Sequence, residues 1–148
     1  MIQRLDHVNI VVSDLTKAGD FFSLLGFSVS PRSKLSGSWI SDVVGLKNVD
    51  AEYVALTHPG PKVKIELIQY HSPLSQIPSA SSQANQIGIR HLAFAVEDIE
   101  AVVGTLKTNG IKFFSEIRTY PATKKKLIYF QGPDGILLEL AEYEKMCC

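Results

Sequence analysis

Two histidines and two glutamates stand at repeating positions in this chain of 148 residues. His7 and His91 lie 84 positions apart, and Glu66 and Glu139 lie 73 positions apart, each within a matching stretch of sequence. Imidazole and carboxylate ligands together suit Mn, Fe(II), Co, Ni or Zn. A closed structural zinc site is not expected, because the set contains two carboxylates and no cysteine. We therefore predict that the four residues bind one divalent ion and leave coordination positions open for water or substrate.

The segments that carry these residues indicate one module used twice. Residues 5–15 align with residues 89–99 without a gap, and residues 65–70 align with residues 138–143. Internal repeats of this kind mean that a single supersecondary unit is built two times. The two histidines and the two glutamates should therefore occupy equivalent places in two similar structures.

Each module has the pattern of a strand, a helix and three further strands. Residues 5–12 alternate and are rich in β-branched types, which predicts a strand. Asp14 is expected to cap a helix that ends at Gly26, and Asp98 one that ends at Gly110. The later strands are expected at 27–32, 51–57 and 63–70 in the first module and at 111–118, 126–131 and 136–143 in the second.

The order βαβββ, found twice, predicts an α+β fold in a single domain over residues 1–148. The first module spans about 3–71, a Ser- and Pro-containing linker about 72–88, and the second module about 89–144. The first module is longer, mostly within 33–49. That stretch holds several apolar residues, and it could form a lid or a dimer contact.

Strand alternation predicts what surrounds the histidines. Asn9 follows on the face of His7, and Ala93 follows on the face of His91, whereas the opposite faces are bulkier. The smaller groups leave room for a bound molecule beside each imidazole.

Composition excludes several classes of protein. Apolar residues make up 45% and charged residues 20%, which is typical of a globular chain, and the formal net charge is +0. Nucleic acid and membrane partners are not expected, because no net positive charge attracts them. The first residues carry no apolar signal stretch. Cys147 and Cys148 are adjacent and crosslink nothing, so we expect a reducing, cytoplasmic setting.

Four segments resemble the vicinal oxygen chelate superfamily: Asp6-His7-Val8, the strand around Glu66, Arg90-His91-Leu92-Ala93-Phe94, and residues 132–140. This superfamily includes glyoxalase I, methylmalonyl-CoA epimerase, extradiol dioxygenases, and fosfomycin- and bleomycin-resistance proteins. The resemblance covers nearly the whole chain. It implies that the curved sheets of the two modules form a cleft around a metal ion held by His7, Glu66, His91 and Glu139.

The resemblance also implies a reaction. A metal-dependent isomerase or lyase, of the glyoxalase I or methylmalonyl-CoA epimerase type, would deprotonate a carbon next to a carbonyl. The ion, Zn, Ni, Co or Mn, would stabilise the enolate, and Glu139 is the better candidate for the base, with Glu66 as its partner. The substrate would be an acyl-CoA thioester or a glutathione adduct, and the protein a homodimer. Residues 124–126, three lysines, could meet an anionic tail, although a solvated turn is the simpler interpretation.

Two other functions stay open. One is a ring-cleaving dioxygenase that uses Fe(II) or Mn(II), in which Glu66 would crowd the positions needed for oxygen. The other is a binding or resistance protein that holds a small molecule without turnover.

The resemblance to the epimerase implies one further acid in the first module, for which Asp50 and Glu52 are the nearby residues.

Overall fold

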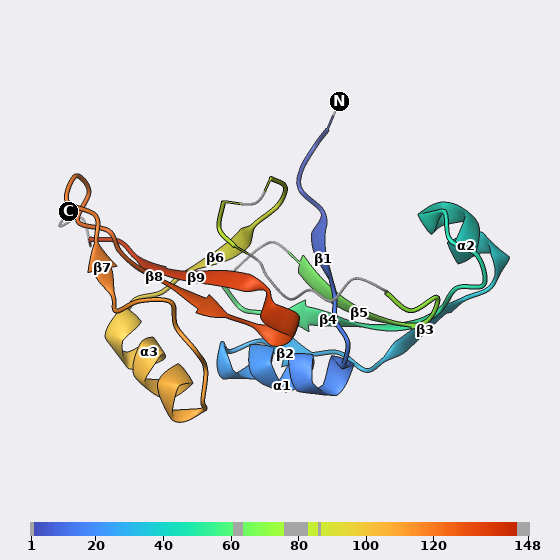
Figure 1. Ribbon diagram of the computed structural model, residues 1–148, viewed down its shortest axis with the longest axis horizontal. Helices are drawn as coiled ribbons and strands as arrows, with labels where there is room; N and C mark the ends of the chain where they lie inside the picture. Colours follow the sequence, from blue (N-terminus) through green and yellow to red (C-terminus); the bar gives the residue numbers. More distant parts are fainter. Residues whose placement is uncertain (1, 61–63, 76–82, 86, 145–148) are drawn as a thin grey trace. The chain divides into compact units, whose positions relative to one another are not determined.

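The sequence repeat is built as two separate sheets, each with its own helix, in a computed structural model of the chain (Figure 1). The chain divides into two units, Met1–Pro78 and Ser79–Cys148. The structure describes residues 2–60, 64–75, 83–85 and 87–144.

In the first unit, β1 lies beside β5 in parallel, and β4 continues the sheet in antiparallel pairing, followed by β2. A further strand, β3, also pairs with β4. The elements are β1 (His7–Val11), α1 (Leu15–Leu24), β2 (Ser28–Val29), β3 (Ser33–Ser36), α2 (Ser38–Val44), β4 (Asp50–Thr57) and β5 (Lys64–Ser72).

The second unit repeats this plan with fewer elements, in the strand order β6-β9-β8-β7. Its elements are β6 (His91–Ala95), α3 (Ile99–Thr108), β7 (Arg118–Thr119), β8 (Lys126–Gln131) and β9 (Leu137–Glu142). A 3-10 turn at Pro133–Gly135 joins β8 to β9. The parallel register also repeats: Asn9 pairs with Glu66, and Ala93 pairs with Glu139.

Two predicted strands are wrong in extent. The stretch 111–118 forms only the two-residue β7 and one isolated bridge between Phe113 and Phe130. Outside β7 it is joined to β8 by two backbone hydrogen bonds, from the Phe114 N–H to the Tyr129 carbonyl and from the Gln131 N–H to the Lys112 carbonyl. The stretch 27–32 is likewise reduced to β2, and β3 and α2 occupy much of the longer 33–49 segment.

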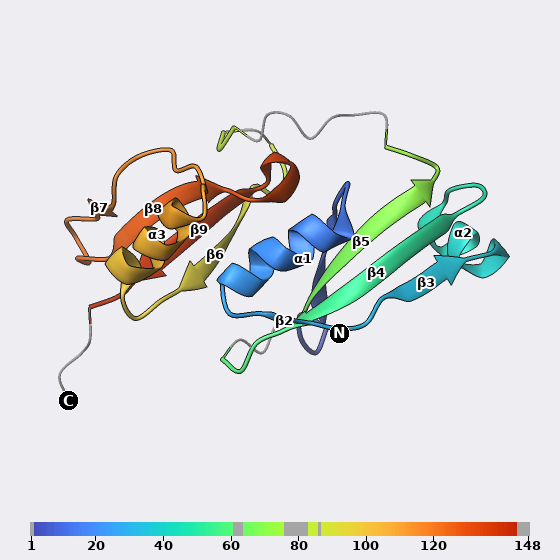
Figure 2. The ribbon, with the colours of Figure 1, turned by 90° about the horizontal axis from the view of Figure 1, so that it is seen from below.

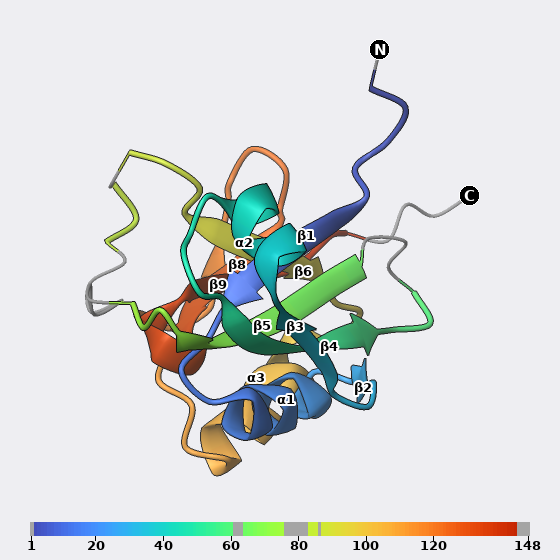
Figure 3. The same cartoon turned by 90° about the vertical axis from the view of Figure 1, so that its right-hand side faces the viewer.

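The helices cover one face of each sheet, as Figure 2 shows for α1 and α3. Their apolar stripes are buried, with Phe22 on α1 and Leu106 on α3 both 0% exposed. The short helix α2 lies on the opposite side of the first sheet from α1 (Figure 3). Its Ile40 packs on Ala51 of β4 and beside Ile68 of β5. The Glu66 face of the first sheet is thus partly covered at one end.

Each main helix begins as the sequence predicts. The Asp14 carboxylate accepts a hydrogen bond from the Lys17 N–H at 3.1 Å, and the Asp98 carboxylate accepts one from the Ala101 N–H at 2.9 Å. An aspartate in this position satisfies an N–H group that the helix itself leaves unpaired.

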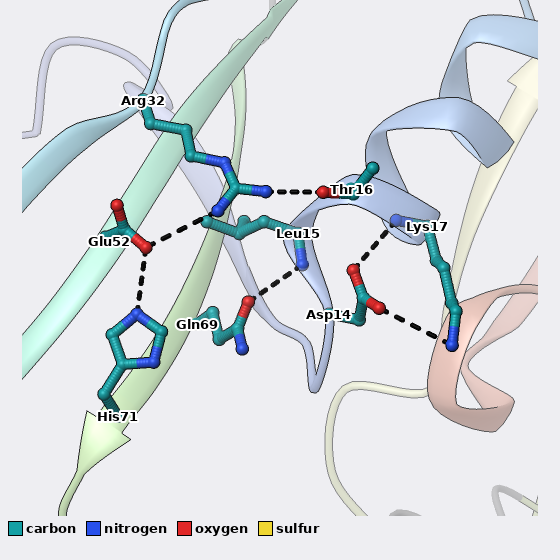
Figure 4. Close-up of polar contacts among 8 residues, drawn as sticks. All are labelled: Asp14, Leu15, Thr16, Lys17, Arg32, Glu52, Gln69 and His71. Carbon is teal, nitrogen blue, oxygen red and sulfur yellow. Dashed lines mark hydrogen bonds and ion pairs between the residues drawn. The ribbon is translucent and has the colours of Figure 1, made fainter.

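A second contact, between sheet and helix, also repeats. The side-chain oxygen of Gln69 on β5 accepts the N–H of Leu15 at 3.0 Å (Figure 4), and that of Glu142 on β9 accepts the N–H of Ile99 at 2.7 Å. Gln69 and Glu142 are 73 positions apart, the same offset as the two candidate glutamates. The last strand of each unit therefore fixes the start of its helix on one face and carries a candidate ligand on the other.

Candidate metal centre

The first unit brings His7 and Glu66 together on the neighbouring strands β1 and β5. Nε2 of His7 lies 3.7 Å from an oxygen of Glu66, and their side chains are 42% and 28% exposed. The other ring nitrogen of His7 lies 3.1 Å from the Asp6 carboxylate. This hydrogen bond, helped by the charge of Glu66, holds the pKa of His7 above its usual value. Imidazole and carboxylate thus share an open face of the sheet.

The second unit brings His91 and Glu139 together in the same way on β6 and β9. Nε2 of His91 lies 3.1 Å from Oε2 of Glu139. The difference from the first unit is burial, because the Glu139 side chain is only 5% exposed. A buried carboxylate needs compensating charge or hydrogen bonds.

Lys125 provides that charge. Its ammonium lies 2.8 Å from Oε1 of Glu139, and its side chain is 24% exposed. This hydrogen bond raises the pKa of Lys125, so the lysine remains an ammonium ion at neutral pH. Of the three consecutive lysines, Lys125 therefore does not lie in a solvated turn but next to a candidate ligand.

Tyr129 completes the polar group around Glu139. It pairs with Glu139 directly across the β8–β9 ladder. Its hydroxyl lies 3.4 Å from Nε2 of His91, and the two rings lie 4.9 Å apart between centroids. Burial, with the charge of Glu139, raises the pKa of Tyr129, so that the hydroxyl keeps its proton and can donate a hydrogen bond.

A pocket of about 380 Å³ adjoins Tyr129 within the second unit. Its volume lies near the lower end of the range for small-molecule sites. The lining is apolar and aromatic with two amides and no charged side chain: Gln83, Ala84, Phe114, Tyr129, Gln131, Gly135 and Leu137.

The donor atoms of each pair fit a metal ion. Bonds of about 2 Å from nitrogen and oxygen ligands place neighbouring ligand atoms about 3 Å apart. The separation of 3.1 Å in the second unit fits this geometry, and the separation of 3.7 Å in the first requires a small side-chain adjustment. The meeting of both pairs at one ion stays a prediction.

A second acidic group, on the helix side of the second unit, has a structural explanation. Asp98, Glu100 and Glu142 place ligand atoms within 4.8 Å of one another. However, the Lys126 ammonium lies 2.8 Å from Glu100 and 3.4 Å from Glu142. Because this lysine neutralises the carboxylates and Glu142 also holds the start of α3, the group serves the fold.

Glu52, a nearby acid considered for the first module, lies on the face away from Glu66. It pairs with Gln69, whose side chain bonds to α1. Figure 4 shows its contacts: His71 at 2.9 Å and Arg32 at 3.5 Å. The His71 hydrogen bond, followed by the charge of Arg32, lowers the pKa of Glu52. Glu52 is therefore not a candidate base beside Glu66.

Sequence reasoning missed the roles of Lys125 and Tyr129. Tyr129 was detectable, because a hairpin with its turn at Pro133–Gly135 places Tyr129 opposite Glu139. Lys125 precedes the strand, and no sequence pattern indicates where its long side chain points. Cys147, Cys148 and part of the linker lie outside the described residues. Within the described part of the chain, no helix is both long and apolar enough to cross a membrane.

Comparisons with known proteins agree with this architecture. The family model of the Glyoxalase/Bleomycin resistance protein/Dioxygenase superfamily matches residues 4–140. The protein YaeR of Escherichia coli, itself uncharacterized, is 31% identical over 95% of this chain and 97% of its own length. Human mitochondrial methylmalonyl-CoA epimerase is 32% identical over 94% of this chain and 73% of its own.

A solved structure with the same fold is that of a glyoxalase family protein from Bacillus cereus. Its sequence is 31% identical and its TM-score is 0.89. The match covers 97% of this chain and 95% of the Bacillus cereus chain. The α+β fold of two βαβββ modules is thus the fold of this relative as well.

Proposed function

The chain belongs to the Glyoxalase/Bleomycin resistance protein/Dioxygenase superfamily, and from that premise we propose that it is a metal-dependent isomerase or lyase. It would remove a proton from a carbon next to a carbonyl, as in the glyoxalase I or methylmalonyl-CoA epimerase type of reaction. One divalent ion, Zn, Ni, Co or Mn, would be held by His7, Glu66, His91 and Glu139.

The observation that carries this proposal is the repeated histidine–glutamate pair. In each unit the imidazole and the carboxylate stand on adjacent parallel strands in the same register. A chance pair in one sheet would have a structural explanation, such as an ordinary hydrogen bond. Two repeat-related pairs of the same composition favour the binding of one metal ion by both pairs.

The chemistry follows from the acidity of the substrate. The carbon–hydrogen bond next to a carbonyl is too weakly acidic for a free carboxylate to break, and a bound ion supplies the charge that stabilises the enolate. Glu139 or Glu66 would accept the proton, in a face lined by small residues such as Asn9 and Ala93. The Tyr129 hydroxyl can donate a hydrogen bond toward the substrate oxygen.

The substrate would be an acyl-CoA thioester or a glutathione adduct. The similarity to methylmalonyl-CoA epimerase supports the first of these. The uncharged pocket beside Tyr129 suits the acyl portion rather than a phosphate or carboxylate. We propose that the protein acts as a homodimer, and sedimentation would measure this.

The test combines metal analysis with hydrogen exchange. Elemental analysis of protein grown in supplemented medium should find one ion per chain. The metal-loaded protein should exchange the α-proton of methylmalonyl-CoA, or of the glutathione hemithioacetal of methylglyoxal, with solvent deuterium, as followed by NMR. Glu139→Gln should slow this exchange by roughly 10²–10⁴-fold, because an amide cannot accept the proton.

Glu97→Gln is the matched control, since Glu97 is exposed and is not one of the candidate ligands. It should exchange at the wild-type rate. Full exchange by Glu139→Gln would move the role of base to Glu66, and absence of bound metal would contradict the proposed function. Oxygen uptake with a catechol would instead favour the dioxygenase.

A further inference from the structure

The two carboxylates proposed as ligands are held to different degrees. Oε1 of Glu139 lies 2.8 Å from the Lys125 ammonium, while Oε2 lies 3.1 Å from His91. The two oxygens of Glu139 therefore contact different partners. Oε2, on the side of His91, is the oxygen that can approach an ion bound by that histidine.

Lys125 is itself held in place. Its ammonium lies 5.5 Å from the ring centre of Tyr143, within the range of a cation–π contact. Its backbone carbonyl accepts the N–H of Tyr120 at 2.8 Å. These contacts hold the lysine at the strand entrance, where its charge compensates the buried carboxylate.

The first unit has no such arrangement among its described residues. Glu66 has His7 as its ion-pair partner, at 3.7 Å, and its side chain is 28% exposed. The residue across the ladder from Glu66 is Ala55, where the second unit has Tyr129 across from Glu139. Ala51 stands four residues before Ala55, as Lys125 stands four residues before Tyr129. Ala51 packs against α2 and carries no charge.

We propose that Lys125 is a positioning residue that reserves one oxygen of Glu139, so that Glu139 binds the ion through Oε2 alone while Glu66 remains free to rotate. This rests on the proposed function. Hydrogen-bonded partners of a ligand commonly orient it and tune the bound ion. An ammonium is well suited to the task, because it donates hydrogen bonds and cannot itself bind a cation.

The test uses Co²⁺ as the probe, because the intensity of its visible d–d bands falls as the coordination number rises. Co²⁺ is titrated into wild-type protein, Lys125→Met, Lys125→Arg and Lys124→Met. Lys125→Met frees Oε1, so Glu139 can bind through both oxygens and the bands should weaken. Lys125→Arg keeps a donor of the same charge and should retain the wild-type spectrum.

Lys124→Met is the matched control, because Lys124 pairs with Glu144 at 3.3 Å and is 71% exposed. Its spectrum should match that of the wild type. A loss of packing alone would lower the melting temperature of Lys125→Met without changing the spectrum of its bound ion. Melting curves recorded beside the spectra separate these two effects, and Lys125→Arg provides the same test if Lys125→Met does not fold.

Two outcomes would overturn the proposal in distinguishable ways. Unchanged bands with tighter Co²⁺ binding in Lys125→Met would mean that the lysine only competes with the ion, and the proposed function would survive. No saturable Co²⁺ binding by the wild type would remove both the positioning role and the metal-dependent function.

Discussion

The two units of this chain share a backbone plan and differ in the surroundings of the glutamate at the equivalent position of each. Glu66 is 28% exposed and lies 3.7 Å from a single histidine, whereas Glu139 is 5% exposed and contacts both a histidine and a lysine. Strand order, parallel register, helix caps and the link from last strand to helix are all repeated. The units differ in β3 and α2, which the first unit adds, and in the residues placed around the shared frame.

The difference is accompanied by an additional helix in the first unit, α2. Ala51 on β4 is small, and Ile40 of α2 packs on it. The second unit has no counterpart of α2 among its described elements, and the Lys125 ammonium reaches Glu139 at the corresponding end of the sheet. A repeat of this kind can therefore keep two like ligands and give them different freedom, which bears on which one transfers a proton.

The largest expected effect tests whether the two pairs act as one site. His7→Ala and His91→Ala should each lower Mn²⁺ affinity by more than roughly 100-fold. Loss of a residue that only hydrogen-bonds to a metal ligand typically costs up to about 100-fold, and loss of a ligand itself should cost more. The losses should be similar despite the different burial of the two units. Isothermal titration with Mn²⁺ measures this, with His58→Ala as a control. Wild-type affinity in either variant would restrict the site to one unit.

A smaller effect concerns the buried pair. Lys125→Met should lower the free energy of unfolding by about 2 kcal/mol, below the 3–5 kcal/mol for breaking a fully buried pair, since Lys125 is 24% exposed. Glu66→Gln in the more open unit should change it by less than about 0.5 kcal/mol. Urea denaturation measures both. Equal effects of the two substitutions would contradict the contrast between the units.

The hydrogen bond from the last strand to the start of the helix should be stronger in the second unit, because its acceptor, Glu142, is charged and the acceptor in the first unit, Gln69, is neutral. Glu142→Leu should cost about 1.5–3 kcal/mol of unfolding free energy, because it removes a charged acceptor from the Ile99 N–H, and Gln69→Leu about 1 kcal/mol. Thermal or urea unfolding monitored by far-UV circular dichroism gives both values. The reverse order would mean that the charge of Glu142 is used mainly for its pairing with Lys126.

The smallest effects are in the titration of surface carboxylates. Hydrogen bonds from His71 and from Lys126 lower the pKa values of Glu52 and Glu100 respectively. A depressed pKa in the folded state contributes stability above the unfolded value, lost as the pH falls through the folded value. Titration by NMR should place both carboxylates below their usual value near 4.5.

His71→Gln should raise the pKa of Glu52 and not that of Glu100, and Lys126→Met should raise the pKa of Glu100 and not that of Glu52. A shift of both carboxylates in either variant would show that the two surfaces are electrostatically coupled. Each variant thus serves as the control for the other.

Local pattern was enough to predict most of the fold. Alternation predicted β1 and β6, and the aspartate–helix–glycine pattern predicted α1 and α3, because hydrophobic period and capping are properties of short segments. The failures lie at 27–32 and 111–118. A short strand at the edge of a sheet depends on a neighbour distant in sequence, and local composition does not encode that neighbour.

The sequence by itself determined the repeat, and with it the four candidate ligands. That inference was possible because matching positions of a repeated module occupy equivalent places in its two copies. The parallel pairing that brings a histidine beside a glutamate in each unit was seen only in the structure. Only the tertiary structure decided that Glu139 is buried, that Lys125 neutralises it and that Glu52 faces away from Glu66. Burial and ion pairing depend on where long side chains come to rest, and this is decided by packing between segments distant in the chain.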